Sequence, residues 1–262
     1  MKTSLASIFI AFILLTAYGC AGRGSDKKDQ PENETASVPD TGYTGIKKYM
    51  SGNYVVKEVT FKNGVREGEM KTFYQTGEVR TKFWYENGLR EDTSYYLYEA
   101  GQVFRKTPYR HDTIHGVALQ YYRTGKLRAR IGYDRGMRTT FFEEYSADGK
   151  LFKGYPDIVA SVSDEYNSRG LYRINLELSD KKTKVDFFSG EFTDNRFDSA
   201  KVKPINVIDG KGNVIDGKGR LDLKKTGVPG QNYVGVIASI LTPLGNRNLV
   251  YKKIALPYND LK

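Results

Sequence analysis

The strongest constraint on this chain is a pair of turn signals that recur together every 24 residues. The first signal is a glycine, which in three copies closes the pattern Tyr-x-x-Gly: Gly77, Gly101, Gly125 and Gly149. The second signal is offset from the first by eleven residues: Gly64, Gly88, Asp112 and Gly136. Two turn signals with one period predict a repeated structural unit. Such arrays build surfaces, so we expect a binding function and no enzymatic activity.

An alternating segment follows each Tyr-x-x-Gly, at residues 79–85, 103–109 and 127–133. Side chains alternate between the two faces of a strand, so these segments predict half-buried antiparallel strands. One face would carry the aliphatic residue that opens each segment and the tyrosine that closes it. The opposite face would carry a set of cationic and aromatic side chains: Arg80, Lys82, Trp84, Phe104, Lys106, Arg128 and Arg130.

The second signal predicts two-residue hairpin turns. Asn63-Gly64 and Asn87-Gly88 favour a type I′ turn, which needs positive φ at both central residues. His111-Asp112 and Arg135-Gly136 stand at the same places in later copies. His111 and His115 are therefore interpreted as turn residues; a metal site is the alternative. About five hairpin units would form an antiparallel meander over residues 43–153, each of them stabilised only by its neighbours.

The segment from Gly68 to Gly77 reads Gly-x-x-x-x-Phe-Tyr-x-x-Gly, and the segment from Gly116 to Gly125 has the same pattern with two tyrosines. This pattern resembles the variant MORN repeat, whose multi-copy arrays occur in bacterial proteins similar to the YwqK-type antitoxin family. The resemblance implies a β-hairpin array and an antitoxin role. Asp92 and Thr140 depart from it, because they replace the first glycine.

Beyond residue 154 the glycine period ends, and seven shorter alternating segments follow. They lie at about residues 157–163, 171–178, 183–193, 205–209, 219–224, 232–241 and 248–256. Seven short strands in a region of this size predict an immunoglobulin-like β-sandwich over residues 154–262; a lipocalin-like or jelly-roll arrangement is the alternative. The chain holds 20 Tyr and 13 Phe against 4 Met, which favours strands throughout. The predicted fold class is all-β.

The N-terminal segment predicts export. Residues 1–19 have a basic start and a short apolar core, as in a signal peptide. The next residue, Cys20, follows Ala-Tyr-Gly, which resembles the bacterial lipobox, although leucine is usual where Ala17 stands. That resemblance implies lipidation of Cys20 and a lipid anchor in the cell envelope, with the outer membrane expected; secretion or a retained signal anchor are the alternatives. Residues 20–42 are polar and predict a flexible tether.

The excess of cationic side chains indicates the kind of partner to expect. Lys and Arg number 41 against 31 Asp and Glu. The candidate binding residues are Arg80, Lys82, Trp84, Lys106, Arg128 and Arg130. They form either a stripe for a protein or an anionic envelope partner, or a solvated face that protects sheet edges. The expected export of the protein argues against a nucleic acid as its partner. No cofactor and no metal are expected, and an immunity or antitoxin protein is the alternative function.

Overall fold

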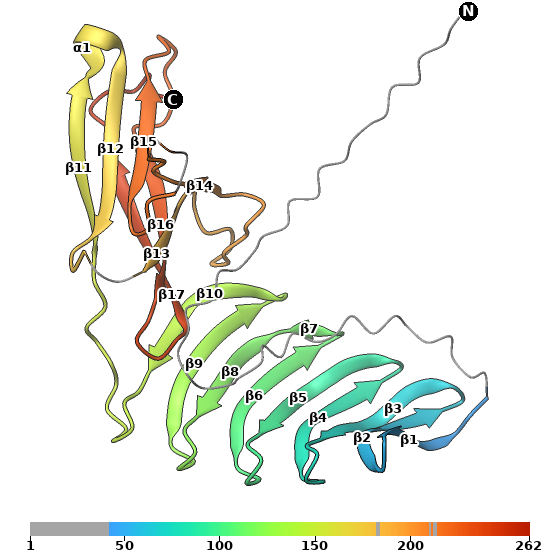
Figure 1. Ribbon diagram of the computed structural model, residues 1–262. Coiled ribbons are helices and arrows are strands. Elements are labelled where there is room, and N and C mark those ends of the chain that lie inside the picture. Colours follow the sequence, from blue (N-terminus) through green and yellow to red (C-terminus); the bar gives the residue numbers. More distant parts are fainter. Residues whose placement is uncertain (1–41, 182–183, 210, 212–213) are drawn as a thin grey trace, which may run out of the picture. The chain divides into compact units, whose positions relative to one another are not determined.

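The computed structural model describes residues 42–181, 184–209, 211 and 214–262. The expected signal peptide, Cys20 and nearly all of the expected tether lie outside these residues. Almost every regular element in the described part is a strand (Figure 1). One helical turn, α1 (Tyr166–Arg169), is the exception. No helix among the described residues is long and apolar enough to span a bilayer. The predicted all-β class is confirmed.

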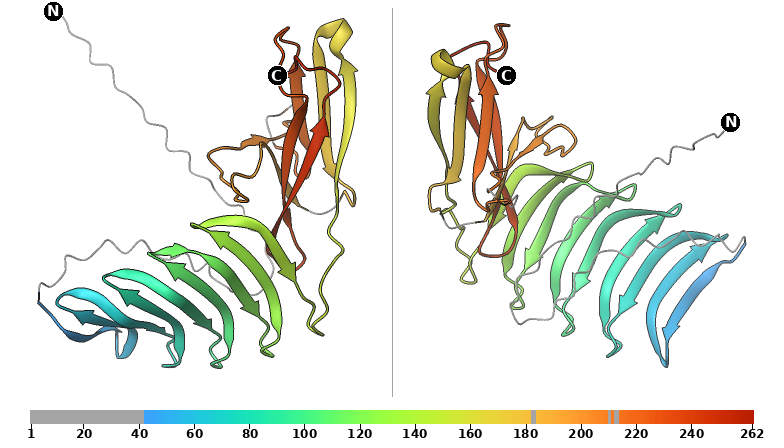
Figure 2. Two further views of the ribbon diagram at one scale, coloured as in Figure 1. Left: turned by 180° about the vertical axis from the view of Figure 1, so that it is seen from behind. Right: turned by 45° about the horizontal axis from the view of Figure 1, so that its top comes forward.

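The repeats form one ten-stranded antiparallel sheet, whose consecutive strands lie side by side (Figures 1 and 2). Its strands are β1 (Gly45–Ser51), β2 (Tyr54–Lys62), β3 (Val65–Phe73), β4 (Val79–Glu86), β5 (Leu89–Leu97), β6 (Val103–Arg110), β7 (Thr113–Ile114), β8 (Gly116–Tyr121), β9 (Leu127–Asp134) and β10 (Met137–Glu144). The order is β1 to β6, then β8 to β10, and the short β7 pairs with β6. The predicted meander is confirmed.

The two-residue turns have the geometry that their sequence predicts. Positive φ occurs at both central positions of all four: Asn63 (52°) and Gly64 (78°), Asn87 (49°) and Gly88 (85°), His111 (48°) and Asp112 (62°), Arg135 (49°) and Gly136 (78°). Residues with a side chain rarely adopt this region, and Asn, Asp and His adopt it most readily. His111 is therefore a turn residue, as predicted.

The tyrosine of Tyr-x-x-Gly connects each copy to the next. Its hydroxyl donates a hydrogen bond to a backbone carbonyl 23 residues further along: Tyr74 to Leu97 (2.7 Å), Tyr98 to Tyr121 (3.2 Å) and Tyr122 to Tyr145 (2.7 Å). We call these three residues the bridging tyrosines. In the last turn Ser146 takes the corresponding place, with the Gly149 amide bonded to its carbonyl. The 24-residue period thus gives each bridging tyrosine the same kind of acceptor in the next copy.

The first glycine of the repeat pattern lies where the strand pairing shifts register. Gly68 (φ 90°) and Gly116 (φ 106°) are in the left-handed region, and Asp92 keeps that conformation at φ 60°. Thr140 does not have positive φ, so only the last copy changes its backbone. In that copy the Thr140 hydroxyl donates to the Asn195 side chain at 2.5 Å, outside the array.

The described residues of the C-terminal part form seven strands in two antiparallel sheets. They are β11 (Ile158–Glu165), β12 (Leu171–Leu178), β13 (Val185–Ser189), β14 (Lys203–Ile205), β15 (Gly219–Lys224), β16 (Tyr233–Leu241) and β17 (Arg247–Ala255). One sheet has the order β11-β12-β15 and the other β14-β13-β16-β17. Buried residues of both sheets form one core, with Ile174, Leu176, Val236 and Ile240 at its centre. The first, second and fifth strands oppose the third, sixth and seventh, as expected for an immunoglobulin-like sandwich, whereas the fourth strand, β14, pairs with β13.

A loop of the sandwich contacts the last repeats through a buried carboxylate. Glu144, at the end of β10, is 1% exposed. It accepts hydrogen bonds from the Thr242 hydroxyl (2.8 Å), the Asn246 amide (2.7 Å) and the Tyr155 hydroxyl (2.9 Å). Asn246 also exchanges hydrogen bonds with the Gln120 side chain. The end of the array is therefore fixed by polar contacts made between β16 and β17.

Candidate binding face of the repeat array

The register of the array places eight side chains, four of them basic, in one row across eight strands. Starting on β2 and ending on β10, each residue pairs with the next: Glu58, Lys71, Lys82, Tyr95, Lys106, Leu119, Arg130 and Glu143. We call this set the lysine row. It contains Lys82, Lys106 and Arg130 of the predicted binding residues. Their common position on one face follows directly from the 24-residue period.

The positive charges at the centre of the lysine row are the ones least neutralised by nearby carboxylates. Lys82 lies between Lys71 and Tyr95, and Lys71 is ion-paired with Glu69 at 2.5 Å. The Lys106 ammonium lies 5.6 Å from the ring centroids of both Tyr95 and Tyr121, within the range of a cation–π contact. Lys82 and Lys106 are two strands apart, or about 10 Å at the usual strand spacing.

Trp84 lies beside the lysine row. Its register partners are Glu69 on β3 and Glu91 on β5. The side chain is 46% exposed, which is unusual for the only tryptophan of the chain. An exposed indole flanked by carboxylates and near lysines offers an apolar surface with a hydrogen-bond donor.

Arg130, by contrast, is already paired. Its guanidinium donates to the Glu143 carboxylate at 2.9 Å and lies 5.1 Å from the Phe141 ring centroid. Hydrogen bonds from Tyr145 and then Arg130 lower the pKa of the Glu143 carboxyl below its usual value. Arg130 is therefore at the neutralised end of the row.

The prediction that side chains alternate strictly between the two faces of each strand is wrong at Arg80, Phe104 and Arg128. Each is the extra residue where the pairing with the preceding strand shifts register. The Phe104 ring contacts Tyr96 and Tyr98, with centroids 5.9 Å and 5.2 Å away, and Tyr96 lies on the face opposite to the lysine row. Phe104 therefore leaves the predicted face, because a β-bulge adds one residue to the two-residue period.

The two arginines at this position also contact bridging tyrosines. Arg80 lies over Tyr74 at 5.9 Å, and Arg128 over Tyr122 at 5.8 Å. Arg128 also donates to the Leu244 carbonyl at 2.5 Å. Arg128 therefore makes intramolecular contacts, and neither Arg80 nor Arg128 belongs to the lysine row.

The opposite face carries a second periodic set of arginines. Arg66, Arg90 and Arg138 lie over tyrosines at 5.5 Å, 4.4 Å and 5.5 Å, respectively: Tyr85, Tyr109 and Tyr133. Burial raises the pKa of Tyr85 and of Tyr109. These contacts cover a largely buried surface, so this face stabilises the array.

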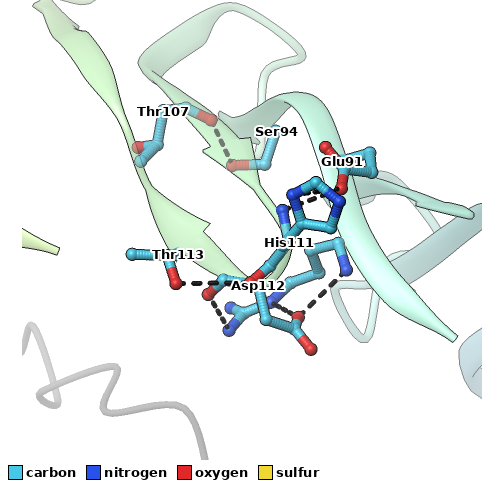
Figure 3. Close-up of polar contacts among 7 residues, drawn as sticks. Glu91, Ser94, Thr107, His111, Asp112 and Thr113 are labelled. Atoms are coloured by element: carbon cyan, nitrogen blue, oxygen red, sulfur yellow. Dashed lines mark hydrogen bonds and ion pairs between the residues drawn. The ribbon is translucent and has the colours of Figure 1, made fainter. Parts of the chain in front are cut away.

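The turns show one feature that the sequence reasoning missed. A glutamate of one copy accepts a hydrogen bond from the turn of the next: Glu91 from the His111 backbone amide at 2.8 Å (Figure 3). His111 Nδ1 also lies 3.5 Å from Glu91. The recurrence of glutamate at positions 67 and 91 is the sequence pattern from which these hydrogen bonds could have been predicted. The described residues hold no cluster of three or more His, Cys, Asp or Glu side chains suited to a metal ion.

Comparison with known proteins identifies one repeat. Residues 114–134 match the MORN repeat variant family. The matched segment runs from the end of β7 through hairpin β8–β9. No curated protein matches the chain. The array therefore contains a variant MORN repeat in its third copy, within a sheet whose turns share one period.

Proposed function

We propose that this protein is a lipid-anchored binding module of the bacterial envelope. In this proposal Cys20 carries the lipid, residues 20–42 form the tether, and the lysine row binds an anionic macromolecule. The match to a variant MORN repeat supports a binding function, because such repeats are generally protein- or membrane-binding modules. The role of Cys20 rests on the sequence alone.

The choice of the lysine row as the binding surface rests on one observation. Among the described residues, no carboxylate lies within ion-pairing distance of Lys82 or Lys106, whereas Lys71 and Arg130 both have carboxylate partners. Two unpaired ammonium groups about 10 Å apart, with Tyr95 between them, form a positive and aromatic strip. Such a strip attracts an anionic partner and can stack on its apolar parts.

Charge reversal tests this surface. The variant Lys82→Glu/Lys106→Glu is compared with Lys203→Glu/Lys224→Glu, which makes the same change in net charge on exposed residues of the sandwich. Envelope fractions are passed over each immobilised protein, and bound material is eluted with increasing salt. We expect only the first variant to lose its partners, with elution of the native complex at moderate salt. Equal loss in both variants would refute a site at the lysine row.

The anchor requires a separate test. Cys20→Ala is expected to move the protein from the membrane fraction to the soluble fraction and to abolish incorporation of labelled palmitate. Retention of either property would refute lipidation at Cys20. This test is independent of the lysine row.

An immunity protein is the second candidate, favoured by the variant MORN repeat at residues 114–134. A neighbouring toxin gene would supply the cognate effector. Co-expression with that effector would then restore growth for the native chain. Failure to restore growth would exclude this function.

A further inference from the structure

The turns of the first repeats are capped by an internal carboxylate. Glu67 Oε2 accepts a hydrogen bond from the Asn87 backbone amide at 2.8 Å, and Glu91 Oε1 accepts one from the His111 amide at 2.8 Å. The second contact is visible in Figure 3. In both copies the glutamate comes 20 residues before the amide that it caps. The array therefore has a built position for a carboxylate between two successive turns.

The third repeat lacks that carboxylate. His115 stands where Glu67 and Glu91 stand in the earlier copies, and Arg135 stands where Asn87 and His111 stand. His115 Nδ1 lies 3.1 Å from Asp134 Oδ1, and its side chain is 43% exposed. In the described part of the chain, no side-chain carboxylate accepts a hydrogen bond from the Arg135 amide.

An open groove of about 580 Å³ occupies this place. Its walls come from two neighbouring turns and from the segment that joins β7 and β8: Arg110, His111, Thr113, His115, Asp134 and Arg135. The groove is the counterpart of the space that Glu91 fills one repeat earlier.

The charge of the groove favours an anion. Its one carboxylate, Asp134, is bonded to Arg196 at 2.7 Å and lies 3.6 Å from Arg135. Glu91 is not among the lining residues, and its carboxylate lies 3.5 Å from His111 Nδ1. The residues that line the groove therefore include two arginines, Arg110 and Arg135, against one carboxylate, Asp134.

We propose that this groove binds a carboxylate group of a ligand. The ligand carboxylate takes the position that the glutamate side chain takes in the preceding repeats, accepts a hydrogen bond from the Arg135 amide, and pairs with the guanidinium groups of Arg110 and Arg135. Charge-assisted hydrogen bonds of this kind are shorter and stronger than neutral ones. The site is separate from the lysine row and does not depend on the function proposed there.

Sodium acetate is the probe for this site. The full chain is titrated with acetate, and the backbone amide signals of Arg135 and His115 are followed by NMR. Parallel titrations use sodium chloride and sodium phosphate at the same ionic strength. We expect a saturable shift of both signals with acetate and a shift at least about threefold smaller with chloride at equal concentration. Equal responses to chloride, or a response to phosphate alone, would overturn the carboxylate site.

Two variants separate binding from folding. His115→Glu restores the internal carboxylate, so we expect acetate affinity to fall at least about tenfold, while an unchanged far-UV circular dichroism spectrum shows that the variant is folded. Lys82→Glu, on the lysine row, should leave the acetate response unchanged. Unchanged acetate affinity in His115→Glu would overturn the proposal. Loss of the acetate response in Lys82→Glu would also overturn it, because the probe would then report only net charge.

Discussion

Removal of one bridging hydroxyl tests the origin of the 24-residue period. In Tyr122→Phe the ring remains over Arg128, but the 2.7 Å hydrogen bond to the Tyr145 carbonyl is lost. A neutral hydrogen bond contributes about 0.5–1.5 kcal/mol, and a partly buried carbonyl without a partner adds to the loss. We therefore expect the free energy of unfolding to fall by about 1–2 kcal/mol. Tyr98→Phe should cost less, because its bond is 3.2 Å long.

Urea unfolding followed by tryptophan fluorescence measures this effect within the array, because Trp84 is the only tryptophan. Tyr95→Phe is the matched control, since no hydrogen bond of its hydroxyl is found among the described residues. Its free energy of unfolding should change by less than about 0.5 kcal/mol. If Tyr122→Phe were as stable as Tyr95→Phe, the bridging tyrosines would contribute only their rings, and the period would need another explanation.

Three further predictions concern other parts of the fold. Glu144→Ala should lower the free energy of unfolding by about 2–4 kcal/mol in urea titrations, because buried donors lose their acceptor; a change below about 1 kcal/mol would contradict the contacts. Gly116→Val should lower the melting temperature, with a cost of about 2 kcal/mol, because its φ is 106° and Pro108 lies 3.3 Å from the added Cβ. The hydrogen bond from Arg196 lowers the pKa of Asp134 below 3.8, so its stabilisation is present above that pH and is lost as the pH falls through the lowered value. Acid titrations of the native chain and Asp134→Asn should therefore differ near pH 5 and converge at the lowest pH; a constant difference would contradict this linkage.

Local signals predicted the strands and turns well. His111-Asp112 differs from Asn-Gly in sequence, but His and Asp are among the residues that most readily adopt positive φ, and both adopt it here. A type I′ turn needs positive φ at both central residues, so residues that tolerate it, at the expected point of the period, are sufficient to locate the turn. The seven strands of the sandwich were located to within a few residues from the alternating segments, although β13 and β14 are shorter than expected.

The faces of individual side chains were harder to predict. Phe104 and Arg128 occupy bulges, which become visible only when the register of the partner strand is known. The contact between Gln120 and Asn246 joins residues 126 positions apart, and no periodic pattern connects them. Of the predicted binding residues, the register places Lys82, Lys106 and Arg130 in one row, because they lie clear of the bulges.

The hydroxyl of each bridging tyrosine donates a hydrogen bond to the copy that follows it. Gain or loss of one whole 24-residue unit would therefore preserve every other such bond, whereas insertion of a partial unit would misplace a carbonyl acceptor. Each added unit would extend the sheet by two strand spacings, about 10 Å. Duplication of one 24-residue unit within the gene would thus lengthen the sheet in fixed steps and leave the contacts between the other copies unchanged.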